Sequence, residues 1–140
     1  MDDRTLSERS YTRALTVAIV LVACLGVAWL ASIYTRPLND VYPFTCVIRD
    51  SHGSTIQLYV IDEEVWQKLQ TMKQQGLHKW VGGRLLRDSQ STLGFRFDPE
   101  TVVVADVTAE TFQTWLQDIS DRLEYWLGVG IAYVWAEVLD

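Results

Sequence analysis

The two histidines and the cysteine nearest to them are the side chains best suited to chemistry, yet their positions favour structural roles. A metal site needs three or four convergent ligands, and His52 and His78 lie 26 residues apart with no carboxylate at ligand spacing. As a nucleophile, Cys46 would need a histidine partner and an electropositive setting. Because Cys46 lies between Thr45 and Val47 in an expected strand, we interpret it as a small buried residue. We therefore predict no catalytic residue, no metal ligand and no cofactor.

Two groups of acidic residues have structural interpretations rather than that of a catalytic pair. Asp98, Glu100 and Asp106 indicate a turn around Pro99, and Asp62, Glu63 and Glu64 indicate the cap and the acidic first turn of a helix. Acid–base catalysis needs two carboxylates that face each other with separated pKa values, and calcium loops have a spacing that neither group shows. If the protein were an enzyme, Asp98 and Asp106 would be the nearest candidates. Gly82-Gly83 lacks the context of a phosphate-binding loop and predicts a bulge in a strand.

Tryptophan is the more informative residue type, with six in 140 residues. Trp115 and Trp126 fall on the apolar face of an expected helix, so we assign them to the core. Trp66 and Trp80 fall at the edges of expected elements. Exposed tryptophan is favoured at protein interfaces, so Trp66 and Trp80 are our candidate docking residues.

These residues need a small domain to position them, and hydrophobic patterning outlines it over residues 44–140. Alternation predicts strands at 44–48, 55–61, 77–87, 93–97, 102–107 and 131–139. One helix should follow Asp62 as N-cap and end at Gly76. A second should follow Thr108 and end at Gly128, with an apolar face at Phe112, Trp115, Leu116, Ile119, Leu123, Trp126 and Leu127. About six strands and two helices make an α+β domain.

A single hydrophobic segment precedes this domain. Residues 14–34 contain no charged side chain, and 21 residues of helix span about 30 Å, the thickness of a bilayer core. We predict a transmembrane helix there, between an N-terminal tail at residues 1–13 and a linker at 35–43. The short linker should hold the domain close to the membrane surface.

Flanking charges predict the orientation of that helix. Arg4, Arg9 and Arg13 precede it and Arg36 follows it. The positive-inside rule then places the N-terminus in the cytoplasm and the domain in the periplasm or a lumen. Residues 21–24 also resemble a bacterial lipobox, in which Cys24 would be lipidated. The apolar run continues for ten residues past Cys24, which favours the spanning helix.

One face of the hydrophobic segment carries small residues every four positions, at Cys24, Ala28 and Ser32. Such residues let membrane helices approach closely, so these three are candidates for helix packing. The remainder of the chain from residue 37 holds 8 basic and 15 acidic residues, a net charge of −7. This balance argues against nucleic acid as a partner and favours solubility or a basic partner surface.

Residues 80–135 resemble a poorly characterised family of small bacterial α+β domains. The matching motifs are Gly82-Gly83-Arg84, Phe95-Arg96-Phe97-Asp98-Pro99, Tyr125-Trp126 and Val134-Trp135. Where the family has Cys-Pro before its last tryptophan, this chain has Tyr133-Val134. The resemblance implies the order of elements and brings no reaction or ligand with it.

Together these features favour a non-catalytic, single-pass accessory or interaction subunit of a larger membrane complex. Its partners would be the lipid bilayer and other membrane-protein subunits. Respiratory and photosynthetic complexes are candidate hosts because they collect small subunits of this kind. The alternative is a ligand-binding or inhibitor module tethered to the membrane. A concave pocket lined by aromatic residues would favour that alternative, and a flat exposed tryptophan surface would favour the subunit.

Overall fold

The computed structural model describes residues 3–34 and 41–139, except for the side chains of 3–9 and 30–34. The chain divides into two compact units, residues 1–37 and residues 38–140. The first holds helix α1 and the second holds a sheet with three further α-helices, so the α+β prediction is confirmed.

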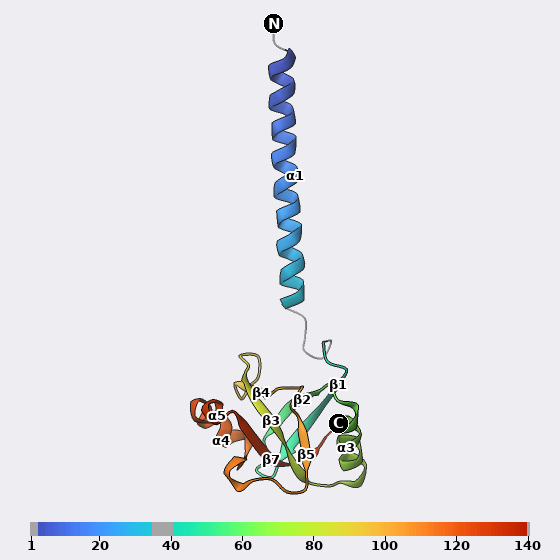
Figure 1. Ribbon diagram of the computed structural model, residues 1–140, viewed down its shortest axis with the longest axis vertical. Coiled ribbons are helices and arrows are strands. Elements are labelled where there is room, and N and C mark those ends of the chain that lie inside the picture. Colours follow the sequence, from blue (N-terminus) through green and yellow to red (C-terminus); the bar gives the residue numbers. More distant parts are fainter. Residues whose placement is uncertain (1–2, 35–40, 140) are drawn as a thin grey trace. The chain divides into compact units, whose positions relative to one another are not determined.

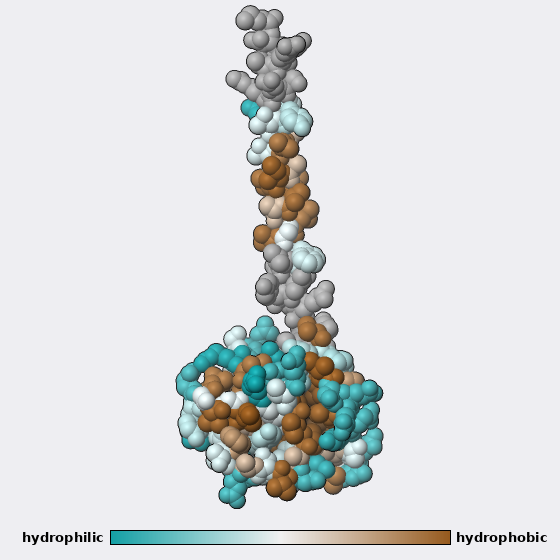
Figure 2. All heavy atoms as spheres, in the orientation of Figure 1, coloured by the Kyte–Doolittle hydropathy of each residue, from teal (hydrophilic) through white to brown (hydrophobic). Residues whose placement is uncertain are grey.

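Helix α1 runs over Asp3–Tyr34. It is longer than the expected span of residues 14–34, because residues 3–13 of the expected tail are also helical. Its segment Ser10–Trp29 is long and apolar enough to cross a membrane. Figure 2 shows hydrophobic residues (brown) around the middle of this helix. The side chains of Cys24 and Ala28 are exposed on it, whereas the side chain of Ser32 and most of the expected linker lie outside the described part.

The second unit is built on seven strands, in the order β2-β1-β7-β3-β4 with β5 beside β3 and β6 beside β7. Their bounds are β1 Phe44–Asp50, β2 Thr55–Val60, β3 Lys79–Arg87, β4 Phe95–Phe97, β5 Val103–Ala105, β6 Gln113–Thr114 and β7 Ile131–Val138. Pairing is antiparallel throughout, except that β6 and β7 are parallel. The sheet curls far enough for β4 to approach β2.

Three α-helices complete the domain: α3 Glu63–Gln75, α4 Leu116–Asp121 and α5 Leu123–Val129. Figure 1 shows α3 on one side of the strands and the α4–α5 pair on the other. Helix α3 matches its prediction: Asp62 caps it through its side chain, and Gly76 ends it in the left-handed conformation at φ 62°.

The second predicted helix is wrong as a single element. Residues 110–112 form a 3₁₀ turn, Gln113–Thr114 form β6, and two short helices follow. The break between them falls at Arg122, whose φ of −120° and ψ of 43° are not helical. The last helix ends at Gly130, with φ 90°, and not at Gly128.

The core fills the concave side of the curled sheet. Alternate residues of the strands other than β6 point into it, and α3 adds Leu69 and Met72, α4 adds Leu116 and Ile119, and α5 adds Trp126. Cys46 belongs to this core at 6% exposure, which confirms its interpretation as a buried strand residue. Burial raises the pKa of its thiol to about 11, opposed by the charge of Lys73, so the nucleophilic thiolate is disfavoured.

Candidate docking face

The central strand β7 sorts its side chains onto two faces. Ala132, Val134 and Ala136 are buried in the core, so the residues between them face outward. The outward-facing residues are Ile131, Tyr133, Trp135 and Glu137. Their neighbours on β3 and β5 face the same way, because paired residues share a face of the sheet.

Register places tryptophans side by side on this outward face. Trp80 of β3 pairs with Trp135 of β7, and their rings meet edge to face at 5.3 Å between centroids. On the other edge of β7, β6 pairs Gln113 with Tyr133 in parallel. Trp115 follows β6 with an extended backbone, φ −135° and ψ 160°, so its side chain keeps the alternation and faces outward.

We call this surface the tryptophan face and define it as Trp80, Trp115 and Trp135 with the adjoining Tyr133, Ile131 and Val103. Trp115 is 41% exposed and Trp135 is 37% exposed. Val103 and Ile131 are exposed as well, at 42% and 37%. Large apolar side chains left accessible on one sheet face are typical of a protein contact surface.

Both histidines of the chain stack on tryptophans of this face. The ring of His52, in the β1–β2 turn, lies 4.7 Å from that of Trp115 at 19°. The ring of His78, just before β3, lies 6.4 Å from that of Trp135 at 21°. One flat side of the Trp115 indole is therefore occupied by an imidazole, whereas His78 lies offset from the Trp135 ring.

Charged residues run alongside the aromatic ones. Glu137 pairs with Arg49 across β7 and β1, and its other carboxylate oxygen lies 3.8 Å from His78 Nε2. Lys79 pairs with the buried Ala136 and so belongs to the other face of the sheet, where its Nζ lies 3.1 Å from Asp106. Arg84, exposed and paired with Ile131 in the ladder, has no carboxylate partner among the described residues.

Gly82 and Gly83 form no bulge, contrary to the prediction. Both continue the regular register with β7, Gly82 opposite Tyr133 and Gly83 opposite Ala132. A Cβ on Gly82 would lie 2.0 Å from the Ala132 carbonyl oxygen and 2.8 Å from the Tyr133 ring. The glycines are there because neighbouring backbone and the Tyr133 ring approach too closely for a side chain.

The structure separates the two docking candidates. Trp80 lies half-buried on the tryptophan face. Trp66 stacks on Phe44 at 5.1 Å and packs against the core from α3. Trp115 was expected in the core and is exposed, so that assignment is wrong, whereas Trp126 is buried at 3% exposure. The pairing of β6 with β7, which joins distant parts of the chain, redirects Trp115 outward.

Two acidic residues missed by the sequence analysis hold this region in place. Asp50, 4% exposed, accepts hydrogen bonds from His52 N and Ser54 N through Oδ1 and from Leu116 N through Oδ2 at 2.7 Å. It therefore shapes the turn that carries His52 and caps the start of α4 beside Trp115. Only its location in a turn-forming sequence hinted at this role.

Asp118 joins the two short helices across their break. Its carboxylate accepts hydrogen bonds from Thr114 Oγ1, from two nitrogens of Arg122 and from Trp126 Nε1. The Arg122 guanidinium is the main reason why its pKa falls to about 2. Both acids thus have hydrogen-bonding partners that account for their positions.

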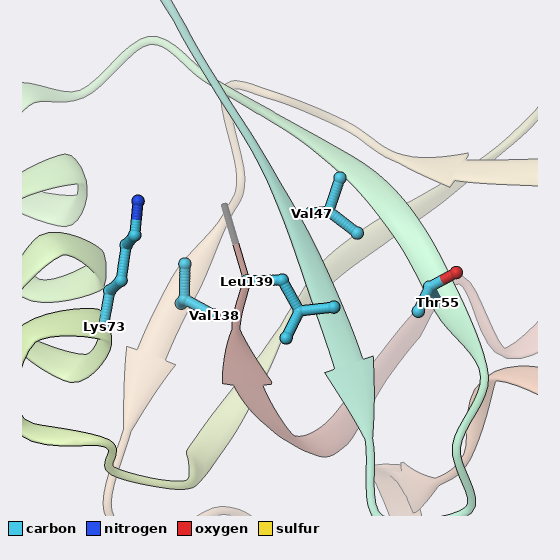
Figure 3. Close-up of a pocket in the computed structure, with 5 residues that line it drawn as sticks. All are labelled: Val47, Thr55, Lys73, Val138 and Leu139. Carbon is cyan, nitrogen blue, oxygen red and sulfur yellow. The ribbon is translucent and has the colours of Figure 1, made fainter.

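Two hollows on the sheet domain are lined by residues outside the tryptophan face. The larger, of about 770 Å³, is open and lined by Val47, Thr55, Lys73, Val138 and Leu139. Figure 3 shows Lys73 on α3 at one side and Val47 and Thr55 on the strands at the other. The smaller, of about 250 Å³, lies along α3 and reaches Lys79. Neither is lined by an aromatic residue.

The acidic groups considered for catalysis are accounted for by local contacts. Asp98 accepts from Glu100 N in its turn, and Asp106 is 81% exposed beside Lys79. Within the described residues, no three His, Cys, Asp or Glu side chains are grouped to hold a metal ion.

No model of a protein family matches the chain, and no curated protein or solved structure is significantly similar to it. The resemblance of residues 80–135 to small bacterial domains therefore stays a prediction.

Proposed function

We propose that this protein is a single-pass membrane protein whose sheet domain binds a protein partner through the tryptophan face. The observation that carries the proposal is the row of Trp115, Trp135 and Trp80 on the outward side of the central strands, with two of the three indoles more than a third exposed. Tryptophan contributes more than most residues to protein–protein binding energy.

The shape of this surface favours a subunit over a ligand-binding module. The tryptophans lie on a strand face, and no aromatic residue lines either of the two hollows described above. The rings of Trp80 and Trp135 meet at 60°, and His52 covers one side of Trp115. Flat ligands such as sugars or bases stack best on free, coplanar rings, whereas protein side chains can fit between tilted ones.

The location follows from α1. We propose that Ser10–Trp29 and the residues after it cross the bilayer, with the N-terminus in the cytoplasm and the sheet domain in the periplasm or a lumen. The apolar length of the helix and the arginines before it support this orientation. Cys24 and Ala28 are exposed on α1 and could pack against a helix of the partner complex.

A mild-detergent purification of the full chain tests the proposal. We expect it to emerge in a complex above monomer mass, and Trp135→Ala to weaken that association by about 30-fold, the loss typical of a central interface tryptophan. Tyr125→Ala is the matched control, because Tyr125 is 55% exposed on α5 and lies outside the tryptophan face. Recovery of the wild-type protein alone, at monomer mass, would overturn the proposal.

A further inference from the structure

Arg84 differs from six other basic residues of the sheet domain in having no anionic partner among the residues that the structure describes. Ion pairs are present at Arg49, Lys68, Lys79, Arg87, Arg96 and Arg122. Residues 37–140 carry 15 acidic residues against 8 basic ones, so carboxylates are abundant. An arginine that stays exposed and unpaired in such a domain is available to a carboxylate from outside it.

The position of Arg84 is fixed by the strands around it. Its backbone N donates to Thr101 Oγ1 at 2.9 Å, and its carbonyl oxygen accepts from Asp98 N at 2.8 Å. It pairs with Ile131 and faces outward, four positions along β3 from Trp80. Because strands rise by about 3.3 Å per residue, Arg84 lies about 13 Å from the tryptophan row along the same face.

We propose, building on the function above, that the partner places a carboxylate on Arg84 while its apolar side chains cover the tryptophan row. Guanidinium binds carboxylate through two parallel hydrogen bonds, which fixes orientation as well as adding energy. Tryptophan and arginine are also the residues most enriched among strong interface contacts. Although the composition favours a basic partner, this face selects an apolar segment with an acidic residue or a free C-terminus.

Synthetic ten-residue peptides test this inference against the full chain in nanodiscs of neutral lipid. Each peptide carries two leucines or phenylalanines, and one Asp or Glu lies two, four or six residues away from them. In a matched twin of each peptide, Asn or Gln replaces the acidic residue. A further pair differs only in a free or amidated C-terminus, which distinguishes a side-chain carboxylate from a terminal one. Fluorescence anisotropy measures binding at low and high salt.

We expect the acidic peptides with four-residue spacing to bind at least about 10-fold tighter than their amide twins, with the preference weakening in high salt. Arg84→Glu should abolish this preference and Arg84→Lys should keep part of it. Lys68→Glu is the matched control, because it makes the same charge change on exposed α3 and should leave the preference intact. Trp135→Ala should weaken the binding of the acidic peptides and of their amide twins to the same extent.

Two results would overturn the inference. One is equal binding of acidic peptides and their twins, including no binding by either. The other is an acidic preference that survives Arg84→Glu. If the complex in detergent still depends on Trp135 in either case, the docking function stands without the carboxylate contact. If that dependence is missing too, the proposed function fails with it.

Discussion

At the scale of single residues, buried carboxylates organise the edge of the tryptophan face. Asp50 is bonded to three backbone N–H groups, so Asp50→Ala would leave buried donors without an acceptor. We expect a loss of about 2–3 kcal/mol in the free energy of unfolding, measured by urea denaturation. Asp62→Ala is the control. The exposed Asp62 side chain caps α3 by accepting a hydrogen bond from Val65 N, and its loss should lower the free energy of unfolding by about 1 kcal/mol. Equal effects would contradict the role assigned to Asp50.

Asp118 should make stability depend on pH in the acid range. Its pKa falls from 3.8 to about 2 in the folded protein, chiefly through its hydrogen bonds to Arg122. Between these values the unfolded chain binds more protons than the folded one, so the stabilisation is complete above pH 4 and is lost as pH falls toward 2. Asp118→Asn should therefore be less stable at pH 7 and show a shallower loss between pH 4 and pH 2. Parallel curves for the two proteins would refute this.

At the scale of elements, the sequence predicted most accurately those helices and strands whose boundaries are set by residues within or next to them. Helix α3 has its cap, acidic first turn and terminal glycine within residues 62–76, and all three were predicted from sequence. The hairpin β1–β2 and the last strand β7 were also placed within two residues. The tryptophan face could not be predicted, because it depends on the pairing of β7 with β3 and with β6, which periodicity does not encode.

The second predicted helix, which is broken in the structure, also shows that local sequence patterns do not encode long-range contacts. Residues 112–127 have the apolar spacing of one helix, yet Asp118 bonds Thr114, Arg122 and Trp126 and stabilises a break. Asp50 then supplies the cap of α4 from 66 residues away. Such long-range contacts override local propensity, and here they turned Trp115 from an expected core residue into an exposed one.

The pairing of β3 with β7 rests on the absence of a side chain at Gly82. Gly82→Ala would place a Cβ 2.0 Å from the Ala132 carbonyl oxygen, a backbone atom that cannot move without breaking the ladder. We expect a loss of more than about 3 kcal/mol or failure to fold, seen by circular dichroism and thermal melting. Gly128→Ala is the control, because α5 leaves open space there and alanine favours helix by up to about 1 kcal/mol. A Gly82→Ala protein with wild-type stability would show that the sheet does not require this close approach.

At the scale of the whole molecule, the described core of the sheet domain contains no residue of α1. A fragment of residues 41–140 should therefore fold without the helix and melt within a few degrees of the full chain. The measurement is thermal unfolding of the fragment in buffer against the full chain in detergent. A fragment that exposes its core, seen as ANS binding and loss of near-ultraviolet dichroism, would show that the anchor contributes to the fold.

The orientation of α1 in the membrane should depend on the few charged residues at its two ends. Arg4, Arg9 and Arg13 precede the apolar segment and Arg36 follows it, so replacing Arg4, Arg9 and Arg13 with Gln reverses the bias. Protease added to intact bacterial spheroplasts should digest the sheet domain of the wild-type chain and leave much of the variant protected. Replacing Lys68, Lys73 and Lys79 with Gln is the control, because charges far beyond the helix end contribute little to topology. If the wild-type domain is protected from the start, the tryptophan face is cytoplasmic, and its partner must be sought on that side of the membrane.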